Sequence, residues 1–518
     1  MNLIKSEFQS SGQSNPCKCV RNCEIILRDY QDYLVDESRL KADKVDCIYF
    51  PSDTQEVSRT LNECNERNLK VVVSGARTGI VGGAVANNID CIISLERMNL
   101  VLSFKENSIR VQGGITLDEM NSYLDQNSPT LFFPVDPTET TASIGGNVAT
   151  NASGARTYFY GPIRNWVNAL TVVLADGSIL NLRRGQIKAE SRTFNFEINN
   201  KKSKFDFPEY LYPETKNTAG ILLTENMDAV DLFIGSEGIL GVITEVELRL
   251  LEKPLSRLYT VIWTLSEDDS LSLVEDIRKS KRLNPLAIEY FDPMSIQLLK
   301  TRRELDGPSS SVPKIDNKAN AAIFLDLIYE SDDELSEITD ALQILLEKCG
   351  LSLENTWSGL EDRDLQKMKQ LRHALPETVN LIVAQRNSVN PQIVKLSTDL
   401  AVPDGFLREM IKIYREKVGS SGIEYVIFGH IGNNHLHMNM LPKTSEELVT
   451  AKKLYHDLAV EAVRLGGSIA GEHGIGRLKR HLMKIQYPDE MLNAMRNLKE
   501  ILDPKGILNP GVLLPDRS

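Results

Sequence analysis

The sequence has no long hydrophobic run, no run of basic residues and no targeting segment of a known type. No apolar stretch approaches the roughly 18 residues of a membrane-spanning helix. The beginning, MNLIKSEFQSSGQSNP, has neither the apolar core of a secretory signal peptide nor an Arg-rich, acid-poor transit pattern. We therefore expect a cytoplasmic protein, and an association with a membrane through a partner stays open.

The charge balance argues against one large class of partner. The net charge is −12, and lysine and arginine do not gather in a run, so nucleic acid is not expected as the main partner. Apolar residues make up 42% and charged residues 25% of the 518 residues, which is the balance of an ordinary globular protein. A chain of this length is too long for one core, so we expect about two to four domains.

Cysteine is scarce and scattered, with seven residues in the whole chain, which argues against a disulfide framework. Cys17, Cys19 and Cys23 lie close together in NPCKCVRNC, and their spacing matches no common zinc or iron–sulfur pattern. Two interpretations stay open for these three. The three cysteines are either reduced free thiols in an N-terminal extension, or ligands that hold a metal or an iron–sulfur centre together with a fourth ligand from elsewhere.

Histidine is equally scarce, but three of the seven histidines lie in FGHIGNNHLHMNM, residues 428–440. A strand places alternate side chains on one face, so His435, His437 and Asn439 point one way and the intervening apolar residues the other. His430 precedes them, across a Gly-Asn-Asn turn that is able to fold it back. The histidines are either half-buried residues satisfied by backbone carbonyls or nitrogen ligands for a metal.

The order of predicted elements divides the chain into three parts. Residues 1–40 are a polar extension with a short helix. In 41–253, strands such as KVVVSG and GVITEVELRLL alternate with helices, one of which starts at Asp53 with Glu56 in capping-box spacing. There Asp176-Gly177 predicts a hairpin turn. In 254–518 the pattern changes, and strands such as LAIEYF and AAIFLDLIY alternate with helices up to residue 440. Each long part has enough residues for its own core.

Three glycine-rich segments lie in the first long part. VVVSGARTGIVGGAV follows a strand and is typical of a loop that points backbone N–H groups at a phosphate, although it matches neither Walker A nor GxGxxG. DPTETTASIGGNVATNASGARTYFYG (136–161) consists of small residues that let the backbone approach a large flat ligand. GSEGILGVITE (235–245) again pairs glycines with a strand. Together they predict an extended ligand; the alternative for the first segment is an ordinary glycine turn.

At this point the motifs resemble a known family. SGARTGIVGG, PVDPTETTASIGGNVATNASG, KNTAG and GSEGILGVITE resemble the FAD-binding domain of the vanillyl-alcohol oxidase superfamily. GHIGNNHLHMN, GEHGIG and DPKGILNPG resemble the C-terminal domain of FAD-linked oxidases. The combination is similar to the D-2-hydroxy-acid dehydrogenase and glycolate oxidase D subunit family, over roughly residues 45–515.

The resemblance implies an α+β fold. It consists of an FAD-binding domain with two α+β subdomains, an α/β substrate-cap domain with an antiparallel sheet, and a C-terminal segment that returns to the flavin. In this family the first loop wraps the FAD diphosphate, the second runs along the flavin and the third lies near the adenine end. The matching residues here are Gly75, Ala76, Arg77, Thr78, Gly79, Gly82, Pro134, Asp136, Thr141, Ser143, Gly146, Asn147, Ala152, Gly154, Glu237, Gly238, Gly241, Ile243 and Asn509. The first loop has no His or Cys that would bond to the flavin, so we expect non-covalent FAD.

The same resemblance implies that His430, His437 and Glu472 bind a divalent metal beside the flavin, zinc or manganese. Two imidazoles and a carboxylate leave open positions on such an ion, and a 2-hydroxy acid is able to chelate there. His435 departs from the family pattern, which often has Asn at this position. His435 is either a third imidazole that faces the metal or a residue that contacts the metal ligands without binding the metal itself.

For the substrate, the resemblance implies His473 as the base that takes the hydroxyl proton, and Arg372 and Asn439 as substrate-side residues. A bidentate guanidinium suits a carboxylate; the alternative for Arg372 is a solvated helix residue. Lys395 is a looser match to the family's substrate-side lysine, because it stands four positions before Asp399.

These expectations amount to flavin-dependent oxidation of a D-2-hydroxy acid (lactate, glycolate or 2-hydroxyglutarate type) to the 2-oxo acid. Hydride passes to FAD N5, with metal-assisted deprotonation by His473. The electron acceptor stays open among a quinone, an electron-transfer flavoprotein, a partner iron–sulfur subunit and oxygen, and so does a homodimer. The alternative is a non-redox FAD enzyme of the same superfamily, such as an alkylglycerone-phosphate synthase, against which GEHGIG argues. A flavin-free metal hydrolase would leave the glycine loops unexplained.

Overall fold

The first part of the fold is a four-stranded sheet with the order β2-β3-β5-β4. The computed structural model describes residues 3–5, 17–198, 201–307 and 310–517. The strands are β2 (Lys18–Arg21), β3 (Cys47–Phe50), β5 (Cys91–Ser94) and β4 (Val71–Ser74). β2 is antiparallel to β3, and the other three strands are parallel. β2 therefore joins residues before position 40 to the sheet that carries the first glycine loop.

Helix α2 (Thr54–Glu66) packs on this sheet, and its start confirms the predicted cap. The Asp53 carboxylate accepts the N–H of Glu56 at 2.8 Å, which satisfies one of the unpaired donors at a helix N-terminus. Val57, Leu61 and Cys64 form its buried stripe. Burial of this stripe holds the helix against the strands.

A second, antiparallel sheet follows, with the order β10-β9-β13-β7-β6. Its strands are β10 (Ile179–Arg183), β9 (Val167–Val173), β13 (Val242–Arg249), β7 (Ser108–Gln112) and β6 (Val101–Lys105). The predicted hairpin between β9 and β10 is confirmed. It turns at Asp176-Gly177, where Gly177 has a φ of +84°, a value that favours glycine.

Smaller elements complete this half of the molecule. They are the strands β1 (Leu3–Lys5), β11 (Thr193–Ile198), β12 (Lys201–Asp206), β8 (Leu131–Phe132) and β14 (Leu251–Glu252), and the helices α1 (Cys23–Asp29), α3 (Leu117–Asn127), α4 (Ile144–Ala149), α5 (Thr157–Tyr160) and α6 (Val230–Phe233). α4 lies in the second glycine-rich segment, and Ser143 caps it by accepting the Gly146 N–H at 3.3 Å.

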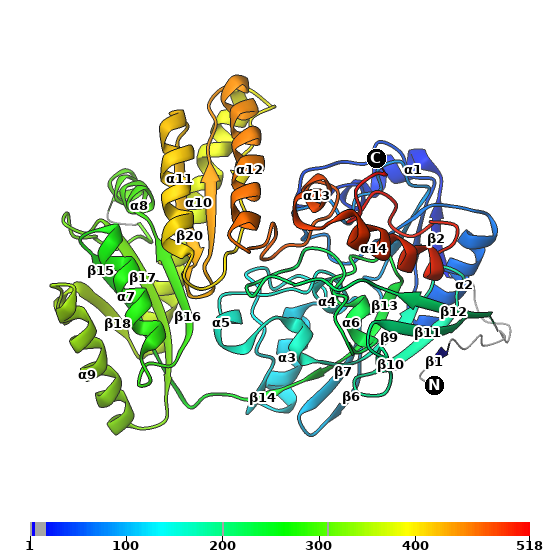
Figure 1. Ribbon diagram of the computed structural model, residues 1–518, viewed down its shortest axis with the longest axis horizontal. Coiled ribbons are helices and arrows are strands. Elements are labelled where there is room, and N and C mark those ends of the chain that lie inside the picture. The colour runs from blue at the N-terminus through cyan, green and yellow to red at the C-terminus, as the bar shows by residue number, and fades with distance from the viewer. Residues whose placement is uncertain (1–2, 6–16, 199–200, 308–309, 518) are drawn as a thin grey trace.

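The second half forms a seven-stranded antiparallel sheet, as predicted, with the order β18-β15-β17-β16-β20-β21-β19. The strands are β18 (Thr356–Gly359), β15 (Ser256–Thr264), β17 (Ala321–Tyr329), β16 (Pro285–Phe291), β20 (Tyr425–His430), β21 (His435–Met440) and β19 (Leu396–Ser397). The helices are α7 (Glu267–Lys279), α8 (Pro293–Asp306), α9 (Asp332–Lys348), α10 (Asp362–Val389), α11 (Leu407–Lys417) and α12 (Ser445–Arg464). Figure 1 shows this seven-stranded sheet and its helices on one side of the molecule and the five-stranded sheet with the order β10-β9-β13-β7-β6 on the other.

After α12 the chain returns to the first half. The helices α13 (Met483–Gln486) and α14 (Asp489–Leu502), red in Figure 1, lie beside the N-terminal elements. Leu508 forms a β-bridge with Val71, and the Asn509 N–H donates to the Val71 carbonyl at 2.8 Å. The predicted return of the C-terminal segment is thereby confirmed.

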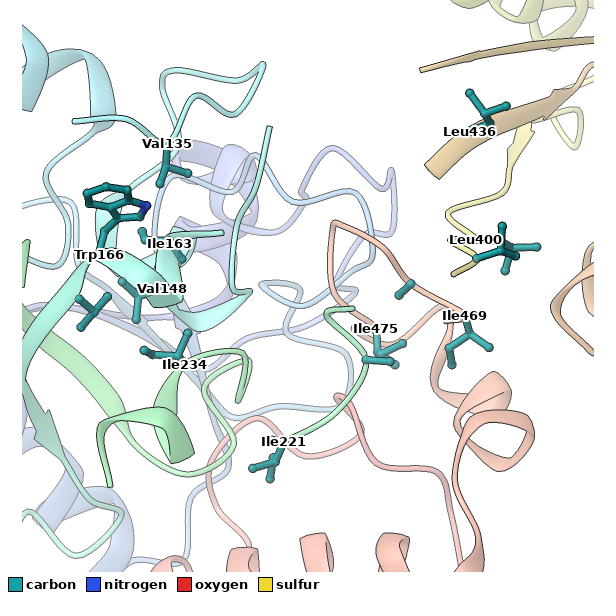
Figure 2. Packing of buried hydrophobic residues seen from close by; sticks show 14 of the residues in the cluster. Val135, Val148, Ile163, Trp166, Ile221, Ile234, Leu400, Leu436, Ile469 and Ile475 are labelled. Carbon is teal, nitrogen blue, oxygen red and sulfur yellow. The ribbon is translucent and has the colours of Figure 1, made fainter. Parts of the chain in front are cut away.

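One hydrophobic cluster runs through both halves. Figure 2 shows part of it, with Val148 and Ile234 from the first half, Leu436 on β21, and Ile469 and Ile475 at either end of the GEHG loop. This packing fixes the position of residues 471–474 between the two sheets. Among the described residues, no helix is long and apolar enough to span a bilayer.

Candidate active site

The three glycine-rich segments meet around one cavity, here called the loop cavity. It is lined by residues of the loop after β4, by α4 and the residues before it, and by the loop before β13. Of the residues predicted to contact a flavin, the following line this cavity: Gly75, Ala76, Arg77, Thr78, Gly79, Ser143, Gly146, Asn147, Glu237, Gly238, Gly241, Ile243 and Asn509. His473, the predicted base, also lines the cavity.

Small residues allow these segments to approach one another closely. A Cβ built at Gly75 would lie 2.2 Å from the Ser143 Oγ, and one at Gly145 would lie 2.7 Å from the Gly113 carbonyl oxygen. A Cβ at Gly79 or Gly83 would meet no protein atom within 4 Å, so the first loop leaves room beside its backbone. A cavity walled by backbone and small side chains from three segments fits a ligand with phosphates, such as FAD.

Glu237 and Asn509 tie the walls of the loop cavity together. The Asn509 Oδ1 accepts the Val73 N–H at 2.9 Å, and its Nδ2 donates to the Glu237 carbonyl at 2.8 Å. The Glu237 carboxylate accepts the backbone N–H groups of Ile475 and Gly476, both at 2.7 Å. Burial raises the pKa of Glu237 to about 7, although these two N–H groups favour the ionised form.

The N-terminal segment braces the first loop from outside. The Arg77 guanidinium lies 4.3 Å from the centre of the Tyr33 ring, a cation–π contact, and the Arg77 carbonyl accepts the Glu37 N–H at 3.3 Å. Gly82, predicted to line the flavin, instead packs against Leu40, whose Cδ1 a Cβ at Gly82 would meet at 2.5 Å. Gly82 is thus a packing position, outside the lining of the loop cavity.

Five other predicted flavin residues also lie outside that lining: Pro134, Asp136, Thr141, Ala152 and Gly154. Thr141 is exposed and donates to the Glu139 carboxylate at 2.5 Å. Asp136 forms an ion pair with Arg156 at 3.4 Å, and a Cβ at Gly154 would lie 2.1 Å from its carbonyl oxygen. Pro134 is buried, and the Ala152 N–H donates to the Asn147 carbonyl at 2.8 Å.

The predicted histidine hairpin is confirmed. β20 and β21 pair with His430 opposite His435, so the Gly-Asn-Asn turn folds His430 back as expected. His430, His435, His437 and Glu472 each offer a ligand atom, and these atoms lie within 4.8 Å of one another; we call these four residues the histidine site. Leu436, Met438 and Met440 point into the core on the other face.

Glu472 lies at the centre of the histidine site. Its carboxylate is 3.2 Å from the His430 Nε2 and 3.8 Å from the His437 Nε2, and it accepts the Ser153 hydroxyl at 3.1 Å. The buried Lys216 ammonium, from the KNTAG segment, also contacts it. Burial opposes its charge, but His430 and Lys216 hold the pKa of Glu472 well below its usual value.

His437 and His430 differ in their pKa values and therefore in their protonation before a metal binds. The His437 Nδ1 lies 3.1 Å from the Thr398 carbonyl, which fixes Nδ1 as the donor and leaves the Nε2 lone pair toward Glu472. Burial, aided by His435, lowers the pKa of His437 well below its usual value. Burial alone would also lower the pKa of His430, but Glu289 and Glu472 raise it to about 9. A cation at the site would therefore replace a proton on His430.

Glu289, on β16, connects the histidine site to the predicted substrate arginine. Its carboxylate lies 2.6 Å from the His430 Nδ1 and 3.1 Å from the Arg372 Nη2 on α10. Burial opposes its charge, but Arg372 and His430 lower the pKa of Glu289 to about 2. Arg372 is thus a paired residue with a side chain that is 27% exposed, which does not fit a freely solvated helix arginine.

Asp399 connects the histidine site to His473. Its carboxylate is 2.9 Å from the His435 Nε2, 3.4 Å from the His473 Nδ1 and 2.6 Å from the Lys479 Nζ. Burial opposes its charge, but Lys479 and His473 hold the pKa of Asp399 well below its usual value. The His435 Nδ1 is buried without a hydrogen-bond partner among the described residues, which leaves that nitrogen free to act as a ligand.

His473 stands between the two regions. Its backbone has a φ of +61°, and its side chain is 36% exposed, whereas that of Glu472 is 8% exposed. Its Nε2 lies 4.0 Å from the Glu472 carboxylate. Glu472 is thus enclosed in the histidine site, whereas the more exposed His473 lines the loop cavity and still lies beside Glu472.

The other two residues predicted to lie near the substrate are Asn439 and Lys395. The buried Asn439 Nδ2 donates to the His437 carbonyl at 3.1 Å, on the same strand face as the histidines. The Lys395 ammonium donates to the Asn380 Oδ1 on α10 at 2.9 Å. Burial lowers the pKa of Lys395, and the positive charge of Arg39 adds to this.

Comparisons with known proteins bear on both regions. Residues 45–183 match the family described as FAD binding domain, and residues 253–513 match FAD linked oxidases, C-terminal domain. A mitochondrial D-2-hydroxyglutarate dehydrogenase from Bos taurus is 31% identical over 90% of this chain and 76% of its own. The chain belongs to the FAD-linked oxidase family. The expected FAD cofactor and the expected class, an FAD-linked oxidoreductase, are thereby confirmed.

Two further relatives and one solved structure are also similar to this chain. A D-lactate dehydrogenase from Archaeoglobus fulgidus is 28% identical over 89% of both chains. A glycolate oxidase subunit GlcD from Bacillus subtilis is 28% identical over 90% of this chain and 88% of its own. An alkyldihydroxyacetonephosphate synthase structure has a TM-score of 0.63 at 19% identity, covering 98% of this chain and 88% of that one. The last likeness concerns the fold alone, and it agrees with the expected α+β fold.

Sequence reasoning missed the charged residues around the histidines: Glu289, Lys216, Lys479 and the carboxylate of Asp399. A signal existed for two of them in this FAD-linked oxidase. Glu289 is the one charged residue in the apolar strand LAIEYF, and Lys216 opens the KNTAG motif. A charge in an otherwise buried stretch indicates a paired or functional group.

Proposed function

We propose that this FAD-linked oxidase oxidises a D-2-hydroxy acid of the lactate, glycolate or 2-hydroxyglutarate type to the 2-oxo acid, with His473 as the base. The observation that carries the proposal is the position of His473. It lines the loop cavity, its Nδ1 lies 3.4 Å from Asp399, and its Nε2 lies 4.0 Å from Glu472. Its imidazole therefore faces both the predicted flavin site and the predicted metal site.

FAD would lie in the loop cavity, held without a covalent bond. Gly75–Gly79 would offer backbone N–H groups to the diphosphate, and Ser143, Gly146 and Asn147 line the same cavity. When bound, FAD supplies the acceptor for a hydride from the substrate α-carbon. The chain's part is to hold that carbon beside the cavity and to exclude water from it.

A divalent cation, zinc or manganese, would bind to His430, His437 and Glu472. Two imidazoles and a carboxylate within 4.8 Å suit such an ion, and the Nδ1 bond of His437 to the Thr398 carbonyl presents its Nε2 as a ligand. When bound, the cation supplies a Lewis acid that lowers the pKa of the substrate hydroxyl. His435 is within reach as a further ligand.

The remaining residues position the substrate and its proton. The Asp399 carboxylate, 3.4 Å from the His473 Nδ1, orients the ring so that Nε2 accepts the hydroxyl proton. Arg372 would bind the substrate carboxylate, with Glu289 fixing its orientation at 3.1 Å. Asn439 and Lys395 are proposed as further substrate-side groups.

The test is anaerobic mixing of the purified flavoprotein with D-lactate, glycolate, D-2-hydroxyglutarate and the L-enantiomers of the two chiral acids. At least one D-acid, or glycolate, should bleach the flavin absorbance in the visible region, and its L-counterpart should not. A protein that binds FAD but is bleached by none of these acids contradicts the proposal. Exchange of an acyl for an alkyl chain without bleaching would instead support the synthase alternative.

A further inference from the structure

Four cysteines that the proposed function does not use line one face of the N-terminal sheet. Cys19 lies on β2, Cys47 on β3, Cys91 on β5 and Cys64 on α2 above them. Cys47 pairs in register with Cys91 across the parallel strands. The three buried ones share a hydrophobic cluster, and Cys19 packs against it. In the described part of the chain, no three of these thiols converge as a metal site would require.

The closest contact joins Cys47 and Cys91. Their Sγ atoms are 2.6 Å apart, within about 0.6 Å of the 2.03–2.05 Å of a disulfide bond. Cys19 is the neighbouring thiol of Cys47 on the β2 side, and Cys64 is that of Cys91 on the other. The four thiols thus form a row in which Cys47 and Cys91 are the central pair.

The surroundings favour a thiolate on Cys47. Hydrogen bonds from the Cys19 and Cys91 thiols lower the pKa of Cys47, and Tyr49 and the positive charge of Arg21 add to this against the opposing effect of burial. Cys47 is 6% exposed, whereas Cys64 and Cys91 are completely buried. Of the central pair, Cys47 is therefore the less deeply buried residue.

We propose that Cys47 and Cys91 form a redox-active thiol pair, in which Cys47 reacts with a hydroperoxide and Cys91 closes a disulfide between β3 and β5. The register pairing and the sulfur contact place the two atoms for this bond without a rearrangement of the sheet. The proposal is independent of the substrate that the FAD-linked oxidase uses.

The chemistry balances with one peroxide per pair. The Cys47 thiolate attacks one peroxide oxygen, so that an S–O bond forms, the O–O bond breaks and the second oxygen leaves as water or an alcohol. The Cys91 sulfur then attacks the Cys47 sulfenic acid, an S–S bond forms, and hydroxide leaves with the Cys91 proton as water. The two thiols lose two electrons, and the peroxide gains them.

The pair lies one strand away from the first flavin loop. β5 pairs with both β3 and β4, and Cys91 stands opposite Val71 at the start of β4. β4 ends at Ser74, immediately before Gly75 of the loop cavity. A bond between β3 and β5 would therefore fix the sheet that carries this loop.

The test uses the full-length, FAD-loaded protein treated with dilute hydrogen peroxide, then alkylated under denaturing conditions and mapped by mass spectrometry. We expect the peptides of Cys47 and Cys91 to be joined, with two thiols lost per chain and both recovered with dithiothreitol. Joining of a different pair, or alkylation of Cys47 and Cys91 as in the untreated protein, overturns the proposal.

Two variants separate the roles of the pair. When Cys91→Ser is combined with Cys19→Ser, which removes the other thiol beside Cys47, Cys47 should stop at the sulfenic acid and be trapped by dimedone at least about tenfold faster than Cys349, whose pKa is raised by burial. Cys349→Ser, at the end of α9, is the matched control and should form the Cys47–Cys91 disulfide as the wild type does. Equal trapping at Cys47 and Cys349 would refute the assigned nucleophile. If the combined variant fails to fold, the wild-type map decides alone.

Discussion

The loop cavity and the histidine site lie side by side but are built in different ways. The cavity is walled by backbone and small residues, such as Gly75 against Ser143 and Gly145 against Gly113. The histidine site is built from buried charges, because Glu472 contacts Lys216 and His430 while the neighbouring Glu289 and Asp399 have cationic partners of their own.

The difference teaches which changes each region tolerates. A buried ion pair is costly to break, because the partner left behind is an uncompensated charge. A cavity made of close backbone contacts is instead sensitive to any added atom. We therefore expect the histidine site to be disrupted by a substitution that removes a charge and keeps the side-chain shape. We expect the loop cavity to be disrupted by a substitution that adds volume and leaves the charge unaltered.

The largest expected effect follows from Glu472→Gln, which removes a charge and keeps the shape. FAD should stay bound, metal should be lost, and flavin reduction by the substrate should slow by about 10³-fold. Lys216 and the protonated His430 would lose an anionic partner, at a cost of about 3–5 kcal/mol in unfolding free energy. Metal analysis, flavin absorbance and urea unfolding measure the three effects.

A second change serves as the matched control for this variant. Glu472→Gln combined with Lys216→Met removes both charges, so much of the stability should return while the activity does not. If the double variant regains substrate reduction, Glu472 is a structural partner of Lys216 and not a metal ligand.

A Glu→Gln change in the loop cavity, at Glu237, should raise the unfolding free energy at neutral pH, whereas Glu472→Gln should lower it. Because burial raises the folded-state pKa of Glu237 from 4.5 to about 7, the folded chain holds a proton that the unfolded chain loses. Stability is therefore lost as pH rises from about 4.5 to about 7, by about 3 kcal/mol in total. Glu237→Gln should remove this slope, and it should be more stable relative to wild type at pH 8 than at pH 5.

Urea unfolding at pH 5, 6, 7 and 8 with saturating FAD measures this. A variant whose stability follows the wild-type pH profile would show that Glu237 keeps an ordinary pKa. In that case the contrast between the two regions would rest on shape alone.

A single added methyl group tests the sensitivity to shape. Gly75→Ala forces the first loop away from Ser143, since its Cβ would lie 2.2 Å from the Ser143 Oγ, and FAD affinity should fall about tenfold or more. Gly79→Ala on the same loop, where no protein atom lies within 4 Å, is the matched control and should fall less. Titration of the apoprotein with FAD compares the two; equal losses would contradict the close approach of the loops.

The smallest effect is expected at Thr141. The resemblance assigned this residue to the flavin, but it is exposed and bonded to Glu139. Thr141→Val should change FAD affinity by less than about twofold. A loss beyond tenfold in the same titration would place Thr141 against the flavin after all.

The two regions also differ in how far the sequence predicts them. The glycine loops are local patterns, and most of the residues predicted from them line one cavity. Strand alternation likewise predicts that His435, His437 and Asn439 share a face. The charged partners of the histidines come from distant positions, with Glu289 lying 141 residues before His430. No local pattern links such residues, because only the seven-stranded sheet brings β16 beside β20.

The central claim is that His473 moves the proton while Glu472 holds the metal, and one experiment separates them. It measures metal content and anaerobic flavin reduction on the same sample of His473→Ala, with His456→Ala, an exposed histidine on α12, as the matched control. The account predicts that FAD and metal stay bound in both variants, that reduction slows by about 10²–10⁴-fold in His473→Ala, and that His456→Ala behaves as the wild type. Loss of metal from His473→Ala, or reduction at the wild-type rate, would contradict the account.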